Sequence, residues 1–256
     1  MTQNCHNTPF ELTYLVFYNK YNDNLKKGDF MDSFAKGINM YKLIWVFVIG
    51  CVLGYMAEML WCYLKHGYFE SRKGVIYGPI SPVYGFGAVL LTLTLNPIAE
   101  TNGVFIFLAC AVIGALFEYV CSFFQEKVFG TVSWEYSHTP LNLHGRTNAS
   151  FAVCWGLLGL IFIRNTYPYV SGLIEKLPNN IGIPLTWCIA ALFLLDLMIS
   201  ALAVNRQRQR RENIEINNSL TRFLDKHYPD ERLEKIYANM QVVEKTPVME
   251  LQKEAM

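Results

Sequence analysis

Residues 43–64 read LIWVFVIGCVLGYMAEMLWCYL, an apolar run interrupted by one acidic residue, Glu58, and by no basic residue. A helix of about 20 apolar residues is long enough to cross the hydrocarbon core of a bilayer. A run of this length, in a chain that is 52% hydrophobic, predicts a transmembrane helix. This stretch therefore indicates the fold class, an all-α integral membrane protein.

Four further stretches share this apolar character: 79–98, 103–124, 149–166 and 184–204. Together with the first run they predict about five transmembrane helices. Prolines 79 and 82 suit the start of the second helix, because proline is tolerated in a first helical turn. Pro168 is expected to end the fourth helix, because proline cannot donate a backbone hydrogen bond in a helix interior.

Charged residues divide the chain into parts with different surroundings. Residues 43–204 hold 7 Lys/Arg and 8 Asp/Glu, whereas residues 205–256 hold 10 and 9 in about a third of that length. We therefore expect an N-terminal segment at 1–42, in part at the membrane interface, a transmembrane domain at 43–204, and a helical, water-exposed tail at 205–256. Two amphipathic helices are predicted in the tail, on either side of Tyr228-Pro229, from apolar faces formed by Leu220, Phe223, Leu224 and His227 and by Leu233, Ile236, Tyr237 and Met240.

The orientation in the membrane follows from basic residues near the helix ends. Four arginines follow the last apolar run: Arg206, Arg208, Arg210 and Arg211. Cytoplasmic loops are enriched in Lys and Arg, so we expect a multi-pass protein of the plasma membrane with a cytoplasmic C-terminal tail. The N-terminal segment, predicted outside, conflicts with this rule through Lys26, Lys27, Lys36 and Lys42. Insertion of the segment around Phe10–Tyr18 would remove the conflict.

Three carboxylates lie inside the predicted helices: Glu58, Glu118 and Asp196. A charged side chain at mid-bilayer costs about 2.5–3.5 kcal/mol on insertion scales, so such residues mark candidate functional sites. All three fall in the cytoplasmic half of their helices, which predicts one polar site facing the cytoplasm. Arg146 is expected on the same side as a counter-charge. The alternative is that each acid only hydrogen-bonds a neighbouring helix.

A 60-residue offset relates two parts of the chain. Gly54 precedes Glu58 by one helical turn, and Gly114 precedes Glu118 in the same way. Small residues allow a second helix to approach closely. The same offset relates Gly85 to Gly145. We therefore predict a degenerate parallel repeat, helices 1–2 against helices 3–4, an arrangement found in transporters with sites at the repeat interface.

Two polar loops carry the most specific patterns: YGPISPVYGFGA at 77–88, and Trp134 through Arg146. Their candidate functional residues are Tyr77, Gly78, Pro79, Pro82, Tyr84, Gly85, Trp134, Glu135, Tyr136, Ser137, Pro140, Asn142 and Gly145. With Gly54 to Glu58, Glu118-Tyr119, Phe129-Gly130 and the tail sequence at 224–233, these patterns resemble the bacterial CmpB-like membrane proteins, the family described as putative ABC-transporter type IV. The resemblance spans about 43–240 and implies a transport role without implying a substrate.

The chain has no G-x-x-x-x-G-K-[ST] loop to hold phosphates. An ATP-driven system would therefore need a separate ATP-binding subunit beside the lipid bilayer, and a homo-oligomer stays open. The cysteine spacing predicts neither a metal site nor a disulfide framework, and we expect no cofactor and no nucleic acid partner. Two alternatives remain: an intramembrane enzyme or lipid-handling protein, which the absence of hydrolase motifs disfavours, and a membrane scaffold or sensor whose tail binds a regulator.

Overall fold

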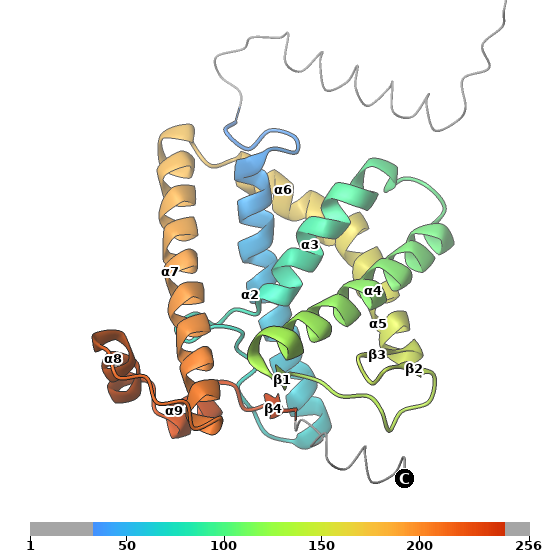
Figure 1. Cartoon of the computed structure of the whole chain (residues 1–256). Helices are drawn as coiled ribbons and strands as arrows, with labels where there is room; N and C mark the ends of the chain where they lie inside the picture. The colour runs from blue at the N-terminus through green and yellow to red at the C-terminus, as the bar shows by residue number, and fades with distance from the viewer. Residues whose placement is uncertain (1–32, 244–256) are drawn as a thin grey trace, which may run out of the picture. The chain divides into compact units, whose positions relative to one another are not determined.

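The computed structural model describes residues 33–243, and from Phe34 onward the chain forms one compact unit. The predicted inserted segment at Phe10–Tyr18 lies outside the described residues. The described part is helical, as predicted (Figure 1). Its helices are α2 (Met40–His66), α3 (Pro82–Leu95), η1 (Asn96–Ile98), α4 (Gly103–Phe129), α5 (Ala149–Ile161), η2 (Phe162–Thr166), α6 (Tyr167–Glu175), α7 (Asn179–Arg211), α8 (Ser219–His227) and α9 (Asp230–Ile236).

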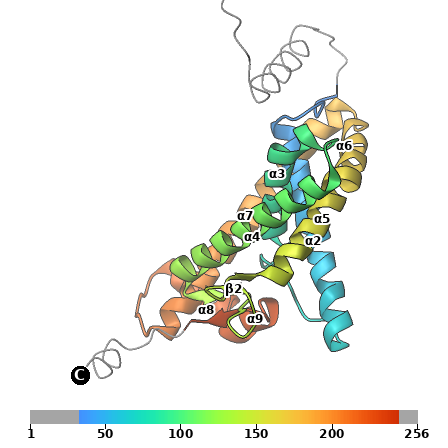
Figure 2. The same cartoon turned by 90° about the vertical axis from the view of Figure 1, so that its right-hand side faces the viewer.

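Four two-residue strands complete the described chain. β1 (Thr131–Val132) pairs with β4 (Gln241–Val242), and β2 (Asn142–Leu143) pairs with β3 (Thr147–Asn148), both antiparallel. In Figures 1 and 2 these strands lie at the same end of the helices as α8 and α9. The Arg206–Arg211 run ends α7 there as well, so we call this the basic end.

Within residues 33–243, four helical stretches are long and apolar enough to cross a membrane: Met40–His66, Gly103–Phe129, Ala149–Glu175 and Asn179–Arg211. The predicted second span is shorter. It begins at Pro82 instead of Pro79 and forms an apolar helix over Pro82–Ile98. The chain is thus a multi-pass membrane protein, its described part contains four long apolar helices and one short one, and the predicted all-α fold class is confirmed.

The predicted break of the fourth span at Pro168 is wrong. The helix continues from α5 through the π-helical segment η2 into α6. Proline in a helix removes one donor and clashes with the carbonyl four residues earlier. The wider π turn, in which Tyr167 N–H donates to Phe162 O, accommodates Pro168 next to the start of α6. This span therefore reaches Glu175.

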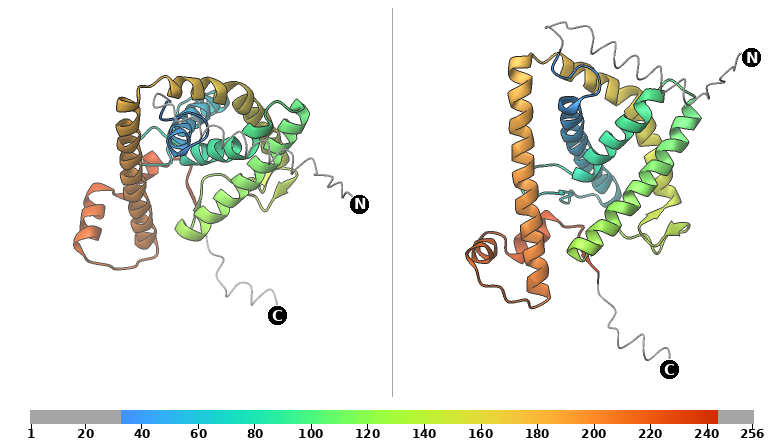
Figure 3. Two further views of the ribbon diagram at one scale, coloured as in Figure 1. Left: turned by 90° about the horizontal axis from the view of Figure 1, so that it is seen from above. Right: turned by 45° about the horizontal axis from the view of Figure 1, so that its top comes forward.

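Close helix crossings organise the membrane part in two pairs. A Cβ atom added at Gly54 of α2 would lie 2.0 Å from the Tyr84 ring of α3. A Cβ atom at Gly114 of α4 would lie 2.5 Å from Cβ of Trp155 in α5. Figures 1 and 3 show the order α7, α2, α3 and then α4 with α5. The pairs α2–α3 and α4–α5 are therefore held by glycines that receive an aromatic ring.

The predicted internal repeat has counterparts in these crossings. Phe47 meets Gly85, Gly50 meets Ala88 and Gly54 meets Tyr84 in the first pair; Phe107 meets Gly156, Cys110 meets Gly159 and Gly114 meets Trp155 in the second. The offset is 60 residues from α2 to α4, as predicted, but 71 from α3 to α5. The expected match of Gly85 with Gly145 is therefore wrong. Gly145 lies in the longer second loop, and Gly156 takes the equivalent position.

Both predicted tail helices are confirmed as α8 and α9. Leu224 of α8, Leu233 of α9 and Tyr228 between the two helices form a buried cluster with Ala203 and Val204 of α7. Asp225 accepts hydrogen bonds from Arg206 at 2.8 and 2.9 Å and from Arg210 at 2.7 Å. Because these guanidinium groups stabilise its charge, the pKa of Asp225 is lowered to about 2. The tail is therefore docked on the end of α7 by apolar contacts and ion pairs together.

The opposite end of the helices contains a buried cation. Lys42 of α2 is fully buried, and its ammonium group lies 2.5 Å from the Glu175 carboxylate of α6. The Ser171 hydroxyl is a second neighbour of this ammonium group. One of the four lysines that conflict with the predicted orientation is therefore neutralised by an ion pair.

Candidate functional site

Glu58 of α2 lies one turn beyond the tight crossing at Gly54. Tyr84, in the first turns of α3, covers Gly54, and its hydroxyl is the hydrogen-bonding neighbour of the Glu58 carboxylate. Pro82 begins α3, where its missing N–H is not needed. The crossing thus places an aromatic hydroxyl beside the first intramembrane carboxylate.

Glu118 of α4 lies in the equivalent place and has more partners. Its oxygens accept hydrogen bonds from the Thr147 hydroxyl at 2.7 Å and the Tyr136 hydroxyl at 3.1 Å, and the Trp155 side chain is a third donor. Tyr136 stacks on Phe151, with ring centroids 4.7 Å apart. Burial and the neighbouring Glu118 carboxylate raise the pKa of Tyr136, which keeps its hydroxyl a donor. Glu118 is only 5% exposed.

The two glutamates are near enough to influence each other electrostatically. Their aromatic partners also meet, because the Tyr84 and Trp155 rings have centroids 5.6 Å apart. The order across the interface is thus Glu58, Tyr84, Trp155 and Glu118. The structure therefore brings together two of the three predicted acids, at the interface between the two helix pairs.

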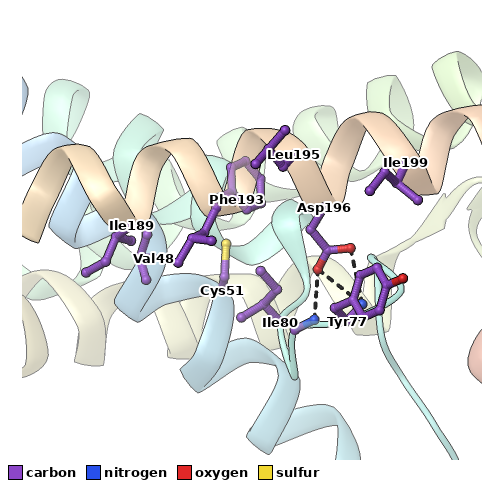
Figure 4. A pocket seen from close by; sticks show the side chains of 11 residues that line it. Val48, Cys51, Tyr77, Ile80, Ile189, Phe193, Leu195, Asp196 and Ile199 are labelled. Atoms are coloured by element: carbon purple, nitrogen blue, oxygen red, sulfur yellow. Dashed lines mark hydrogen bonds between the residues drawn. The ribbon is translucent and has the colours of Figure 1, made fainter.

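Asp196 of α7 contacts a loop instead of the other acids. Its carboxylate accepts backbone N–H groups of Tyr77 at 3.1 Å and Gly78 at 2.8 Å (Figure 4). The Ser200 hydroxyl also donates to it at 3.2 Å. It borders an apolar cavity of about 490 Å³ between α2 and α7. Since its oxygens already have these donors, Asp196 anchors the first loop to α7.

Arg146 has a different partner from the one predicted. Its guanidinium forms an ion pair with Glu126, two turns beyond Glu118 on α4, and lies over the Phe123 ring at 5.4 Å. The Ser122 hydroxyl accepts a further hydrogen bond at 3.4 Å. The hairpin formed by β2 and β3 directs the side chain toward the basic end of α4. The expected pairing of Arg146 with Glu58, Glu118 or Asp196 is therefore wrong.

The motif of the second loop stabilises the loop itself. Glu135 accepts the Ser137 N–H at 2.6 Å, and hydrogen bonds from the Ser137 side chain and from this N–H lower the pKa of Glu135. Asn142 accepts the Gly145 N–H at 3.0 Å and donates to two carbonyls across the turn that holds Pro140. Gly145 has φ +67°, and a Cβ atom there would meet Ser137 Oγ at 2.5 Å. These residues shape the hairpin that carries Tyr136 and Thr147 to Glu118.

The Trp134 indole N–H donates to the Arg146 carbonyl at 2.9 Å and so joins both ends of this loop. In the first loop, Tyr77 contacts the tail, with its hydroxyl 2.7 Å from that of Tyr228. The Gly74 N–H donates to the Ile80 carbonyl at 2.9 Å and closes a turn that contains exposed Pro79. The predicted loop residues are therefore mainly the supports of the site, attached to α7 and to the tail.

A second cavity, of about 320 Å³, opens at the basic end beside Glu58. Its walls come from α2, α3, α4 and α7, from both loops, and from tail residues 237, 239 and 240. Arg72 and Lys73 line it together with Glu58. Glu118 does not line it. Of the two glutamates, Glu58 is the one that faces an open space.

A family model described as Putative ABC-transporter type IV matches residues 45–201. The chain belongs to this family of CmpB-like proteins. No curated protein and no solved structure matches the chain. The match runs from α2 through most of α7 and includes both helix pairs with both glutamates. It ends before α8 and α9, so the expected resemblance of the tail lies outside the matched residues.

Several residues that surround the two glutamates of this CmpB-like chain could not be predicted from the sequence. Thr147 and Trp155 lie 29 and 37 residues from Glu118; the loop hairpin brings Thr147 to it, and the α4–α5 crossing brings Trp155. Arg72 and Lys73 are visible in the sequence as basic residues between two apolar runs, but nothing in the sequence identifies them as cavity residues. Across residues 33–243, no group of three or more His, Cys, Asp or Glu side chains is arranged to hold a metal ion.

Proposed function

We propose that this chain is the membrane-spanning permease subunit of an ABC-type transport system, with Glu58 and Glu118 at its polar site. The observation that carries the proposal is the meeting of two equivalent glutamates at the interface of two repeated helix pairs. In transporters built from repeats, substrate sites lie at the repeat interface. The membership in a family of ABC-transporter type IV proteins supports the transport class.

The energetics favour a functional role for at least one of the acids. A carboxylate within a span costs about 2.5–3.5 kcal/mol on insertion scales. Glu118 offsets this cost with several donors, whereas Glu58 has Tyr84 as its neighbour and borders the cavity. A carboxylate kept at such a cost beside an open cavity is typical of a substrate or proton site.

The proposed site opens toward the cytoplasm. The cavity beside Glu58 lies at the basic end, and the positive-inside rule assigns this end to the cytoplasm of a plasma-membrane protein. A separate ATP-binding subunit would dock at the same end, since the chain has no phosphate-binding loop. Residues 1–42, 43–204 and 205–256 are proposed as the interfacial segment, the membrane domain and the cytoplasmic tail.

The test is co-purification of the tagged full-length chain from membranes in mild detergent, followed by photo-labelling with an azido-ATP analogue. We expect a labelled ATP-binding subunit in an amount stoichiometric with the chain, and we expect the purified complex to have ATPase activity. The Glu58→Gln variant should retain the subunit but change ATPase activity in liposomes, whereas Glu100→Gln, an exposed acid at the other end, should not. A chain that purifies without any ATP-binding partner would contradict the proposal.

A further inference from the structure

The cavity beside Glu58 has a polar side with charges of both signs. Glu58, Arg72 and Lys73 line it, and Arg72 is held by an ion pair with Glu70 at 2.8 Å. Within residues 33–243, neither Lys73 nor Glu58 takes part in an ion pair. The cavity thus offers one ammonium group and one carboxylate that have no ion-pair partner in this range, although the Tyr84 hydroxyl hydrogen-bonds the carboxylate and Arg72 attracts it electrostatically.

The cavity lining also includes apolar side chains that are exposed on the membrane helices. Phe86 of α3 and Phe124 of α4 line it, and they are 52% and 61% exposed. Leu197 and Val204 of α7 continue this wall. Exposed aromatic rings on membrane helices face acyl chains in a bilayer. The lining therefore combines charged groups with apolar side chains, two of which are exposed aromatic rings on membrane helices.

The size of the cavity suits a head group. Its volume of about 320 Å³ lies at the lower limit of ligand pockets, which span roughly 300–1,000 Å³. A ligand that left its chains along the rings of α3 and α4 would need to bury only its polar part. Binding sites combine such apolar walls with a few fixed polar groups that set the orientation of the ligand.

We propose that this cavity binds a zwitterionic amphiphile whose head group carries a phosphate and an ammonium group. The phosphate lies on Lys73, with Arg72 beside it, and the ammonium group faces the Glu58 carboxylate. The acyl chains run along Phe86 and Phe124. Charge-assisted hydrogen bonds to phosphate and carboxylate supply the selectivity for both charges. The inference names a ligand class for the site of the proposed function. The view that this ligand is a transport substrate rests on that proposed function.

The experiment measures lipid retention by the purified full-length chain, in nanodiscs and by native mass spectrometry. Its probes are phosphatidylethanolamine, phosphatidic acid, which lacks the ammonium group, and a neutral diacylglycerol. The wild type should prefer phosphatidylethanolamine. Lys73→Ala should weaken binding of both phosphate lipids about tenfold. Lys73→Arg should restore it, and Glu58→Gln should remove the preference between them.

Lys127→Ala is the matched control, because Lys127 is an exposed lysine at the same end that lies over Phe123 outside the cavity. It should bind lipids as the wild type does, and circular dichroism should show that every variant is folded. Equal retention of all three lipids, or an unchanged Lys73→Ala variant, would overturn the inference. Competition by inorganic phosphate at equal concentration would assign the site to free phosphate and would also overturn it. The assay needs no ATP-binding subunit, so its failure leaves the permease proposal standing.

Discussion

The helix pairs α2–α3 and α4–α5 have the same arrangement of crossing residues, but the surroundings of their glutamates differ. Each pair crosses at a glycine that receives an aromatic ring, and each has a glutamate one turn farther on. Glu118 is closed in by Thr147, Tyr136 and Trp155, whereas Glu58 borders a cavity. The longer loop after α4 makes the difference, because its hairpin covers Glu118. One copy of the repeat thus satisfies its acid internally, and the other leaves it available.

The largest effect should come from the crossing glycines. In Gly54→Ala the new methyl group meets the Tyr84 ring at 2.0 Å, and in Gly114→Ala it meets Trp155 at 2.5 Å. Overpacking of this kind costs about 1–3 kcal/mol, so both variants should lose stability similarly if the pairs are equivalent. Thermal unfolding in detergent measures this. Gly172→Ala is the control, because a methyl group there would have no atom within 4 Å. Loss in only one of the two would break the equivalence.

The second effect separates the two glutamates. Glu118→Gln replaces a charged acceptor of several hydrogen bonds. A hydrogen bond to a charged group contributes about 1.5–3 kcal/mol, so this variant should lower the unfolding free energy by about 2 kcal/mol. Glu58→Gln should change it by less than about 1 kcal/mol, since fewer donors lose a charged partner. Chemical unfolding in one detergent compares them. Equal losses would mean that Glu58 is as closed as Glu118.

A smaller effect concerns the donors supplied by the second loop. Thr147→Val removes the 2.7 Å hydrogen bond to Glu118 and should cost about 1–2 kcal/mol. In the Glu118→Gln background the same change should cost less, because the two residues share one interaction. A double-mutant cycle of unfolding free energies measures the coupling. Additive losses would show that Thr147 stabilises the loop independently of Glu118.

The smallest effect concerns the tail. Its residues Tyr237, Asn239 and Met240 border the cavity beside Glu58, which Glu118 does not line. The pKa of Asp225 is lowered in the folded chain, so its ion pairs stabilise docking above the unfolded pKa of about 3.8 and lose this contribution as the pH falls toward about 2. The half-exposed pair contributes less than about 1 kcal/mol. The protection factors of α8 and α9 amides, which are corrected for the pH dependence of intrinsic hydrogen exchange, should fall from pH 5 to pH 2, and Asp225→Asn should remove most of this fall. An unchanged profile in that variant would exclude this pair as the cause.

Sequence reasoning reaches the features that local composition determines. The apolar runs, the tail helices and the glycine–glutamate pairs depend on spacing along one helix, and all five runs are helical, although the second is shorter than predicted and the fourth is longer. It fails where a loop conformation decides. The partner of Arg146, the loop contacts of Asp196 and the offset of Gly156 all depend on how 67–81 and 130–148 fold back. The prediction that the fourth helix ends at Pro168 fails for a related reason. The wider π turn before Pro168 tolerates a proline that ordinary helix rules exclude.

The accessibility of the two glutamate positions tests the central difference most directly. Glu58→Cys and Glu118→Cys would be placed separately in a chain whose seven natural cysteines are replaced by alanine. Inside-out and right-side-out vesicles would then receive a membrane-impermeant thiol reagent. We expect rapid labelling at position 58 from the cytoplasmic side and little at position 118 from either side. Equal labelling at both positions, or labelling of position 58 only from outside, would contradict the account.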